Sequence, residues 1–147
     1  PAVWGRETMP WYQTAALWLS AHTVPKAKLT GQGLKIMASD NIEMLRALGR
    51  DPLVIKKTRV DAVYGLTNLM DAALEAARDL DLPMLILYGK KDQIIPNAPT
   101  ELMLARLPES GKADRKVIFY ANGYHMLTRD LQGQTVWRDI ATWIDAR

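Results

Sequence analysis

The sequence predicts an α/β fold, in which a helical segment is followed by the β-α-β-α end of a doubly wound parallel sheet. Two continuous apolar runs, at 84–88 and 117–120, are typical of strands that are buried on both faces. Each run is followed by a segment with helical periodicity, and this alternating order is that of a right-handed βαβ unit with parallel strands. Up to residue 81, in contrast, the patterned stretches have helical spacing.

Three helices are predicted before the first strand. Trp11, Trp18 and His22 fall at i, i+7 and i+11, which predicts a helix over about 10–24 with these side chains on one face. His22 has no partner in this pattern, so we interpret it as a structural residue. The face as a whole is interpreted as a packing face.

Two capping boxes predict where the other two helices begin. Asp40 and Glu43 have the spacing of a capping box, and the short helix that follows them ends at Gly49. Thr58 and Asp61 have the same spacing and precede the longest helix, over about 59–79.

The second half of the chain alternates strands and helices. Gly89 ends the first strand, and Asn97 is the expected cap of a helix over about 98–107. The second strand leads through a loop to a last helix over about 131–146. Two parallel strands with buried faces are too few for a stable sheet, so we expect them to be one end of a larger sheet. We expect the exposed sheet edge to be covered by a missing N-terminal half or by another copy.

The loops after the two strands carry the titratable groups of interest. Asp92 lies four residues beyond the first strand, and His125 lies five residues beyond the second. Because functional groups in doubly wound sheets lie beyond the carboxyl ends of the strands, these two loops are expected to meet. Asp92 would then accept a hydrogen bond from one ring nitrogen of His125 and leave the other free to take a proton. Taken singly, Asp92 also fits a turn residue and His125 a structural histidine.

The segments "LPMLILYGKKDQIIP" and "VIFYANGYHMLTRDLQGQTVWRDIATWI" resemble the C-terminal part of α/β-hydrolases of the monoacylglycerol lipase and lysophospholipase type. "GRDPLVIKKTRVDAVYGLTNLMDAA" resembles the helical cap of these enzymes, and "PAVWGR" resembles the chain leaving the core strand before the cap. The resemblance implies three parts: the exit from a core strand at 1–9, a cap or lid at 10–82, and the C-terminal β-α-β-α of the core at 83–147.

The resemblance also implies a function. It implies a serine hydrolase that cleaves carboxylic esters, with monoacylglycerol-like or lysophospholipid-like substrates, through an acyl-enzyme in which Asp92 and His125 are catalytic. The nucleophilic serine of this family lies in a Gly-x-Ser-x-Gly elbow, and Ser20, Ser39 and Ser110 do not lie in such a motif. We therefore expect a C-terminal fragment that lacks the nucleophile and the oxyanion hole and is inactive alone.

Two alternative functions stay open at this point. An aspartate at the missing elbow would indicate an epoxide or haloalkane hydrolase. A protein with no nucleophile anywhere would be a hydrolase-like scaffold for binding, or an association module. For the substrate, Trp11, Trp18 and Met70 are candidate lining residues of an acyl-chain tunnel, although residues at helical spacing also fit an ordinary core.

Composition excludes several other classes. The 147 residues are 48% hydrophobic and 24% charged, with no cysteine and a net charge of +3, which is ordinary globular composition. The one basic cluster, Lys56 and Lys57 with Arg59, lacks interleaved aromatic residues, so we expect no nucleic-acid binding and at most peripheral contact with anionic membrane lipids. The two histidines have no metal-ligand spacing. We expect no metal, no cofactor and a cytoplasmic location.

Overall fold

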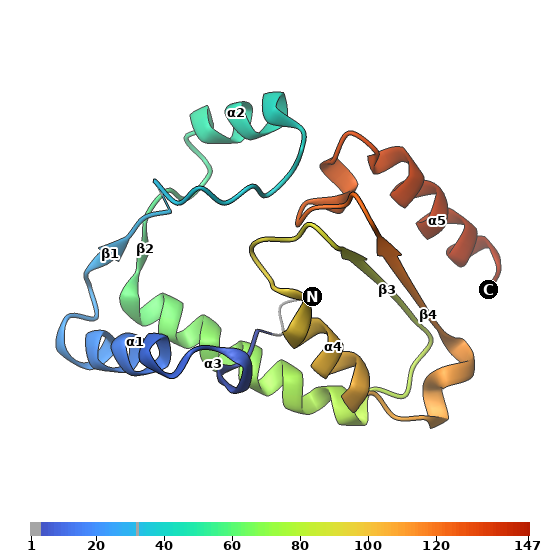
Figure 1. The fold of residues 1–147 in the computed structure, drawn as a ribbon, viewed down its shortest axis with the longest axis horizontal. Coiled ribbons are helices and arrows are strands. Elements are labelled where there is room, and N and C mark those ends of the chain that lie inside the picture. Colours follow the sequence, from blue (N-terminus) through green and yellow to red (C-terminus); the bar gives the residue numbers. More distant parts are fainter. Residues whose placement is uncertain (1–3, 32) are drawn as a thin grey trace.

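The computed structural model describes residues 4–31 and 33–147, which form five helices and two small sheets (Figure 1). The helices are α1 (Trp11–Thr23), α2 (Ile42–Arg50), α3 (Val60–Ala76), α4 (Asn97–Arg106) and α5 (Gly133–Asp145). The strands are β1 (Lys28–Leu29), β2 (Thr58–Arg59), β3 (Met84–Gly89) and β4 (Arg115–Tyr120). Short 3-10 turns continue α3 at Ala77–Asp79 and precede β4 at Ser110–Asp114.

The predicted pair of parallel strands is confirmed. β3 pairs with β4 in parallel, in a register that runs from Met84 opposite Arg115 to Gly89 opposite Tyr120. In Figure 1, α4 lies on the β3 side of this pair and α5 lies on the β4 side. Because the strands are parallel and Gly89 is opposite Tyr120, both strands end at the same rim of the sheet, and the loops that follow them begin there.

The first half of the chain is mostly helical, as expected, but it also contains one short strand pair that was not predicted. β1 and β2 form a short antiparallel pair, in which Lys28 is opposite Arg59 and Leu29 is opposite Thr58. Thr58 thus lies in a strand and does not cap α3. The amide of Val60 donates to Ala27 O at 2.9 Å, and that of Asp61 donates to Pro25 O at 3.1 Å. Two of the backbone donors at the start of α3 thus find acceptors in the segment before β1, in place of a side-chain cap.

Two further predicted caps are displaced by one residue. The cap of α2 is Asn41, whose Oδ1 accepts from Met44 N at 3.1 Å, whereas Asp40 Oδ1 accepts from Leu131 N at 2.8 Å. α4 begins at Asn97 itself, after Pro96. Asn and Asp both suit the cap position, so neighbouring residues of these types compete for it, and a contact distant in sequence decides the outcome at Asp40.

The core lies between α3, α4 and β3. Its buried members are Leu74, Ala77, Ile86, Met103 and Leu107. The first residues of β3 are only half-buried, in contrast to the expectation of a strand buried on both faces. Among the described residues, no helix is long and apolar enough to cross a membrane.

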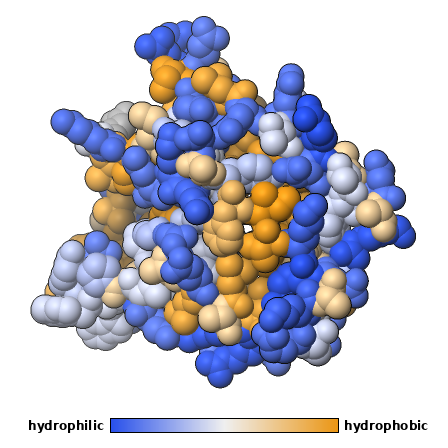
Figure 2. All heavy atoms as spheres, turned by 45° about the vertical axis from the view of Figure 1, so that its right-hand side comes forward, coloured by the Kyte–Doolittle hydropathy of each residue, from blue (hydrophilic) through white to orange (hydrophobic). Residues whose placement is uncertain are grey.

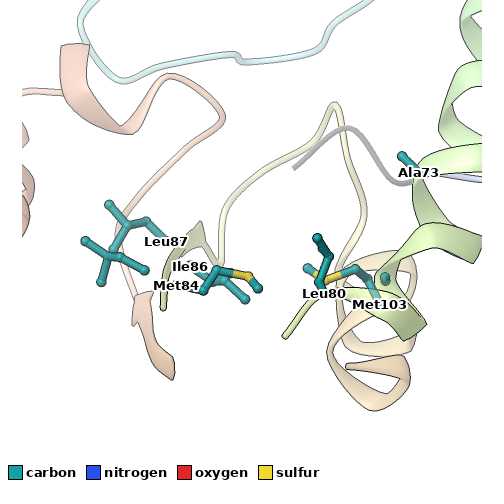
Figure 3. Close-up of a pocket in the computed structure, with 8 residues that line it drawn as sticks. Ala73, Leu80, Met84, Ile86, Leu87 and Met103 are labelled. Carbon is teal, nitrogen blue, oxygen red and sulfur yellow. The ribbon is translucent and has the colours of Figure 1, made fainter. Parts of the chain in front are cut away.

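One apolar side of β3 is open. Met84 and Ile86 face Leu80 and Met103 across a cavity of about 480 Å³, and Leu87 points to the other side of the strand (Figure 3). Figure 2 shows a band of apolar surface in the middle of the molecule, surrounded by hydrophilic side chains. Within residues 4–31 and 33–147, β3 pairs with β4 alone, so its second edge forms no ladder there.

Candidate active site

Asp92 lies in a tight turn directly after β3. Its amide donates to Gly89 O at 3.0 Å, which closes the turn. Its Oδ1 accepts from the amides of Ile94 and Ile95, at 2.8 and 2.9 Å. These bonds are those of an Asx turn. They hold Oδ1 toward the turn of Asp92 itself and leave Oδ2 facing away from that turn.

His125 lies in the loop after β4 and contacts Asp92. His125 Nδ1 donates to Asp92 Oδ2 at 2.8 Å, which confirms the predicted contact between the two loops. The Asp92 side chain is 7% exposed, whereas the His125 side chain is 38% exposed. The carboxylate is thus shielded behind the imidazole, and Nε2 is the ring nitrogen that is left to exchange a proton with a reactant.

The turn of Asp92 is also held by a buried tyrosine. Tyr88 Oη donates to Ile95 O at 2.8 Å, and the Tyr88 ring packs edge-on against Phe119 of β4. Burial, followed by the negative charge of Asp92, raises the pKa of the Tyr88 hydroxyl. The hydroxyl therefore stays protonated and remains a donor to the loop.

Two glycines let the loops approach each other. A Cβ at Gly89 would lie 2.4 Å from Gly123 O, and a Cβ at Gly123 would lie 3.1 Å from Gly89 Cα. The amide of Lys91 donates to Gly123 O, and that of Lys90 donates to Tyr120 O, both at 2.9 Å. The loops that carry Asp92 and His125 are therefore joined backbone to backbone. The sequence indicated Gly89 only as the end of a strand.

We expect Gly89→Ala to destabilise the full-length protein by at least about 2 kcal/mol, because the new methyl group would overlap backbone atoms that cannot rotate away. Urea unfolding measures this change. The matched control is Gly65→Ala in α3, where a Cβ would meet no atom within 4 Å and alanine favours the helix by roughly 0.5–1 kcal/mol. Equal unfolding midpoints for both variants would show that the loops do not need this close approach.

The sequence did not indicate two polar residues near His125. The buried carboxylate of Asp130 accepts from the amide of Tyr124 at 2.8 Å, and it also accepts from Ser39 Oγ at 2.6 Å. Asp130 follows His125 by five residues, which is a weak local signal. Ser39 is 91 residues from Asp130 in the sequence, so no local pattern joins them.

The candidate tunnel residues lie on the helices of the first half. Trp11 is 80% exposed, and Trp18 is half exposed and stacks on His22, with ring centroids 4.4 Å apart. Met70 is buried in α3. Their role in lining a tunnel stays a prediction, as does their relation to Asp92 and His125.

The basic cluster has partners close by in the sequence. Lys56 Nζ donates to Leu48 O at 2.6 Å, at the end of α2, and Arg59 pairs with Asp61. Contact of this cluster with lipid head groups stays a prediction.

None of Ser20, Ser39 and Ser110, which the structure describes, forms a hydrogen bond with His125. Within the described residues, no group of three or more His, Asp or Glu side chains could hold a metal ion.

Comparisons with known proteins identify the family and several relatives of this chain. Residues 1–132 match the family model described as "Serine aminopeptidase, S33". A monoacylglycerol lipase from Mycolicibacterium smegmatis is 25% identical over 132 residues, which are 82% of this chain and 46% of the relative.

Two solved structures share the fold. The crystal structure of Paleococcus ferrophilus monoacylglycerol lipase matches with a TM-score of 0.79 and 22% identity, over 97% of this chain and 55% of that one. A soluble variant of Saccharomyces cerevisiae monoglyceride lipase, solved in complex with a substrate analog, matches with a TM-score of 0.71 and 18% identity, over 97% and 52%. The chain thus spans about half the length of these proteins.

Proposed function

This chain belongs to the serine aminopeptidase S33 family of α/β-hydrolases, and we propose that the protein hydrolyses carboxylic esters through an acyl-enzyme. The observation that carries the proposal is the hydrogen bond of 2.8 Å between His125 Nδ1 and Asp92 Oδ2, at the rim where both strands end. In this arrangement His125 is the general base and acid, and Asp92 orients it.

The reaction follows from the tautomer that Asp92 imposes. With its proton on Nδ1, His125 has an unprotonated Nε2, which takes the proton of a serine hydroxyl as its oxygen attacks the ester carbonyl. Asp92 stabilises the imidazolium that forms. His125 then gives the proton to the leaving alcohol, and the same cycle with water releases the acid from the acyl-enzyme.

We propose that the serine and the oxyanion-stabilising amides come from chain outside these 147 residues. None of the three serines lies in a Gly-x-Ser-x-Gly motif, and Ser39 is fully buried with its hydroxyl bonded to Asp130. The relatives are about twice as long as this chain, which supports the same conclusion. The chain alone is then expected to be inactive.

The open side of β3 supports this proposal independently. Its apolar residues line a cavity of about 480 Å³, and its second edge forms no ladder within the described residues (Figure 3). Exposed apolar sheet surface with an unpaired edge is a template for another strand. We propose that further strands of the same protein pair here and bring the serine to the rim at which His125 lies.

The relatives whose names include a substrate are called monoacylglycerol lipase or monoglyceride lipase. We therefore propose monoacylglycerols or similar acyl esters as the substrate class. The pair of Asp92 and His125 fits any acyl transfer, so the relatives' names supply the preference for lipid esters.

Assays of the full-length protein on three substrate classes test this function. We expect hydrolysis of a monoacylglycerol and of p-nitrophenyl butyrate, and little or no cleavage of an aminoacyl p-nitroanilide. Preferred opening of an epoxide would instead indicate an aspartate nucleophile. No turnover of any of these substrates would favour a non-catalytic scaffold and contradict the proposal.

A further inference from the structure

We propose that Asp130 is a positioning residue for His125 and couples it, through Ser39, to the segment 38–41 that precedes α2. This inference rests on the proposed function, because it assigns Asp130 a role in presenting the base. It concerns residues that touch neither the substrate nor the reacting atoms, so their effect on the reaction is indirect.

The backbone on both sides of His125 is held by hydrogen bonds. The amide of Tyr124 donates to Asp130 Oδ2 at 2.8 Å, and the amide of Met126 donates to Ala38 O at 3.0 Å. The imidazole is itself 38% exposed, so packing restrains it less than it restrains a buried side chain. The direction of the His125 side chain therefore depends on these two amides and on Asp92.

Asp130 joins the histidine loop to a distant segment. Its Oδ1 accepts from Ser39 Oγ at 2.6 Å, and Ser39 Oγ in turn accepts from the amide of Asn41 at 3.2 Å. Ser39 is 0% exposed and Asp130 is 5% exposed. Oδ2 of Asp130 thus accepts a hydrogen bond from the histidine loop, and Oδ1 accepts one from the segment 38–41.

The segment 38–41 is bonded to the histidine loop at further points. Asn41 Nδ2 donates to Arg129 O at 3.1 Å, and the amide of Leu131 donates to Asp40 Oδ1 at 2.8 Å. Just before the segment, the amide of Met37 donates to Gln93 Oε1 at 2.9 Å, next to Asp92. The chain that leads into α2 thus bridges the loops of both Asp92 and His125.

The burial of the Asp130 carboxylate without a nearby cation costs free energy, which a purely structural contact would avoid with a neutral side chain. No Lys, Arg or His nitrogen of the described residues lies within 4.0 Å of the Asp130 carboxylate, and its bonds come from neutral donors. Bonds from neutral donors to a carboxylate are short and strong, which suits a fixed position. Removal of the carboxylate leaves the buried Ser39 hydroxyl and the Tyr124 amide without their acceptor.

The test is Asp130→Ala in the full-length protein, assayed on p-nitrophenyl butyrate. We expect kcat to fall about 10²-fold, the effect of misplacing a reacting group by about 1 Å, with KM changed less than about threefold. Asp130→Asn restores much of kcat, because its amide oxygen still accepts from the Tyr124 amide. A purely structural role would change the unfolding midpoint without this split between kcat and KM.

The matched control is Asp139→Ala. Asp139 of α5 accepts from the buried Tyr120 hydroxyl at 2.7 Å, so its loss also leaves a buried donor unpaired, but it forms no described hydrogen bond with the histidine loop. We expect Asp139→Ala to lower stability and leave kcat within about twofold of the original protein.

A second readout does not depend on activity. The His125 Nδ1 proton, bonded to Asp92, is expected to give a low-field proton NMR signal, which is assigned by its loss in His125→Gln. We expect Asp130→Ala to broaden or abolish this signal and Asp139→Ala to keep it. If the original protein hydrolyses no ester, the proposed function fails, and the signal still tests the positioning. An Asp130→Ala variant with an unchanged signal and unchanged kcat would overturn the inference.

Discussion

Replacement of His125 by alanine is expected to lower kcat of the full-length protein on an ester by roughly 10⁴-fold or more. His125 is the one described group at the rim that carries a free ring nitrogen and is oriented by a buried carboxylate. Without it, no side chain takes the proton from the attacking hydroxyl. Steady-state assays with p-nitrophenyl butyrate measure the effect, and KM is expected to change much less than kcat.

His22→Ala is the matched control for this variant. His22 is the other histidine of the chain, is exposed, and bonds with its ring nitrogen to Trp18 O at 2.7 Å on the same helix. We expect its replacement to leave kcat within about twofold, since exposed residues away from a site have small effects. If His125→Ala kept a tenth or more of the original kcat, His125 would not be the base.

Asp92→Asn is expected to lower kcat by about 10⁴-fold while the loop keeps its structure. The amides of Ile94 and Ile95 both need an acceptor, so the asparagine oxygen will face them and its NH₂ group will face His125. Nδ1 must then accept a hydrogen bond, which moves the ring proton to Nε2. In this tautomer, Nε2 cannot take a proton from the nucleophile.

The orientation of the asparagine makes this prediction specific. Asp92→Ala removes the turn bonds as well, so we expect it to lower both kcat and stability, whereas Asp92→Asn lowers mainly kcat. Asp114→Asn serves as the control, because Asp114 is largely exposed and distant from both loops in sequence. An Asp92→Asn variant with near-normal kcat would show that Asp92 does not set the tautomer of His125.

The contact between Asp92 and His125 was predictable because it follows from backbone topology. The apolar runs at 84–88 and 117–120 identify adjacent parallel strands, and such strands end at one rim. Side chains placed four and five residues beyond them therefore meet, without any knowledge of the intervening helix. The catalytic roles of the two residues are the part that we propose.

The polar bonds between distant segments could not be predicted. Ser39 and Asp130 are separated by 91 residues, and Asp40 is drawn to Leu131 and away from its expected role as a cap. The pairing of β1 with β2 involves two residues in each strand, which is too short for a periodic pattern. Contacts of this kind depend on how the first half of the chain is placed over the sheet.

The most direct test of the proposed mechanism is covalent labelling of the full-length protein with a fluorophosphonate, followed by mass spectrometry of its peptides. We expect one modified serine, which lies in a Gly-x-Ser-x-Gly motif outside these 147 residues, and strongly slowed labelling in His125→Ala. An unlabelled protein, or a label on Ser20, Ser39 or Ser110, would contradict the claim that Asp92 and His125 serve a serine nucleophile supplied from outside these residues.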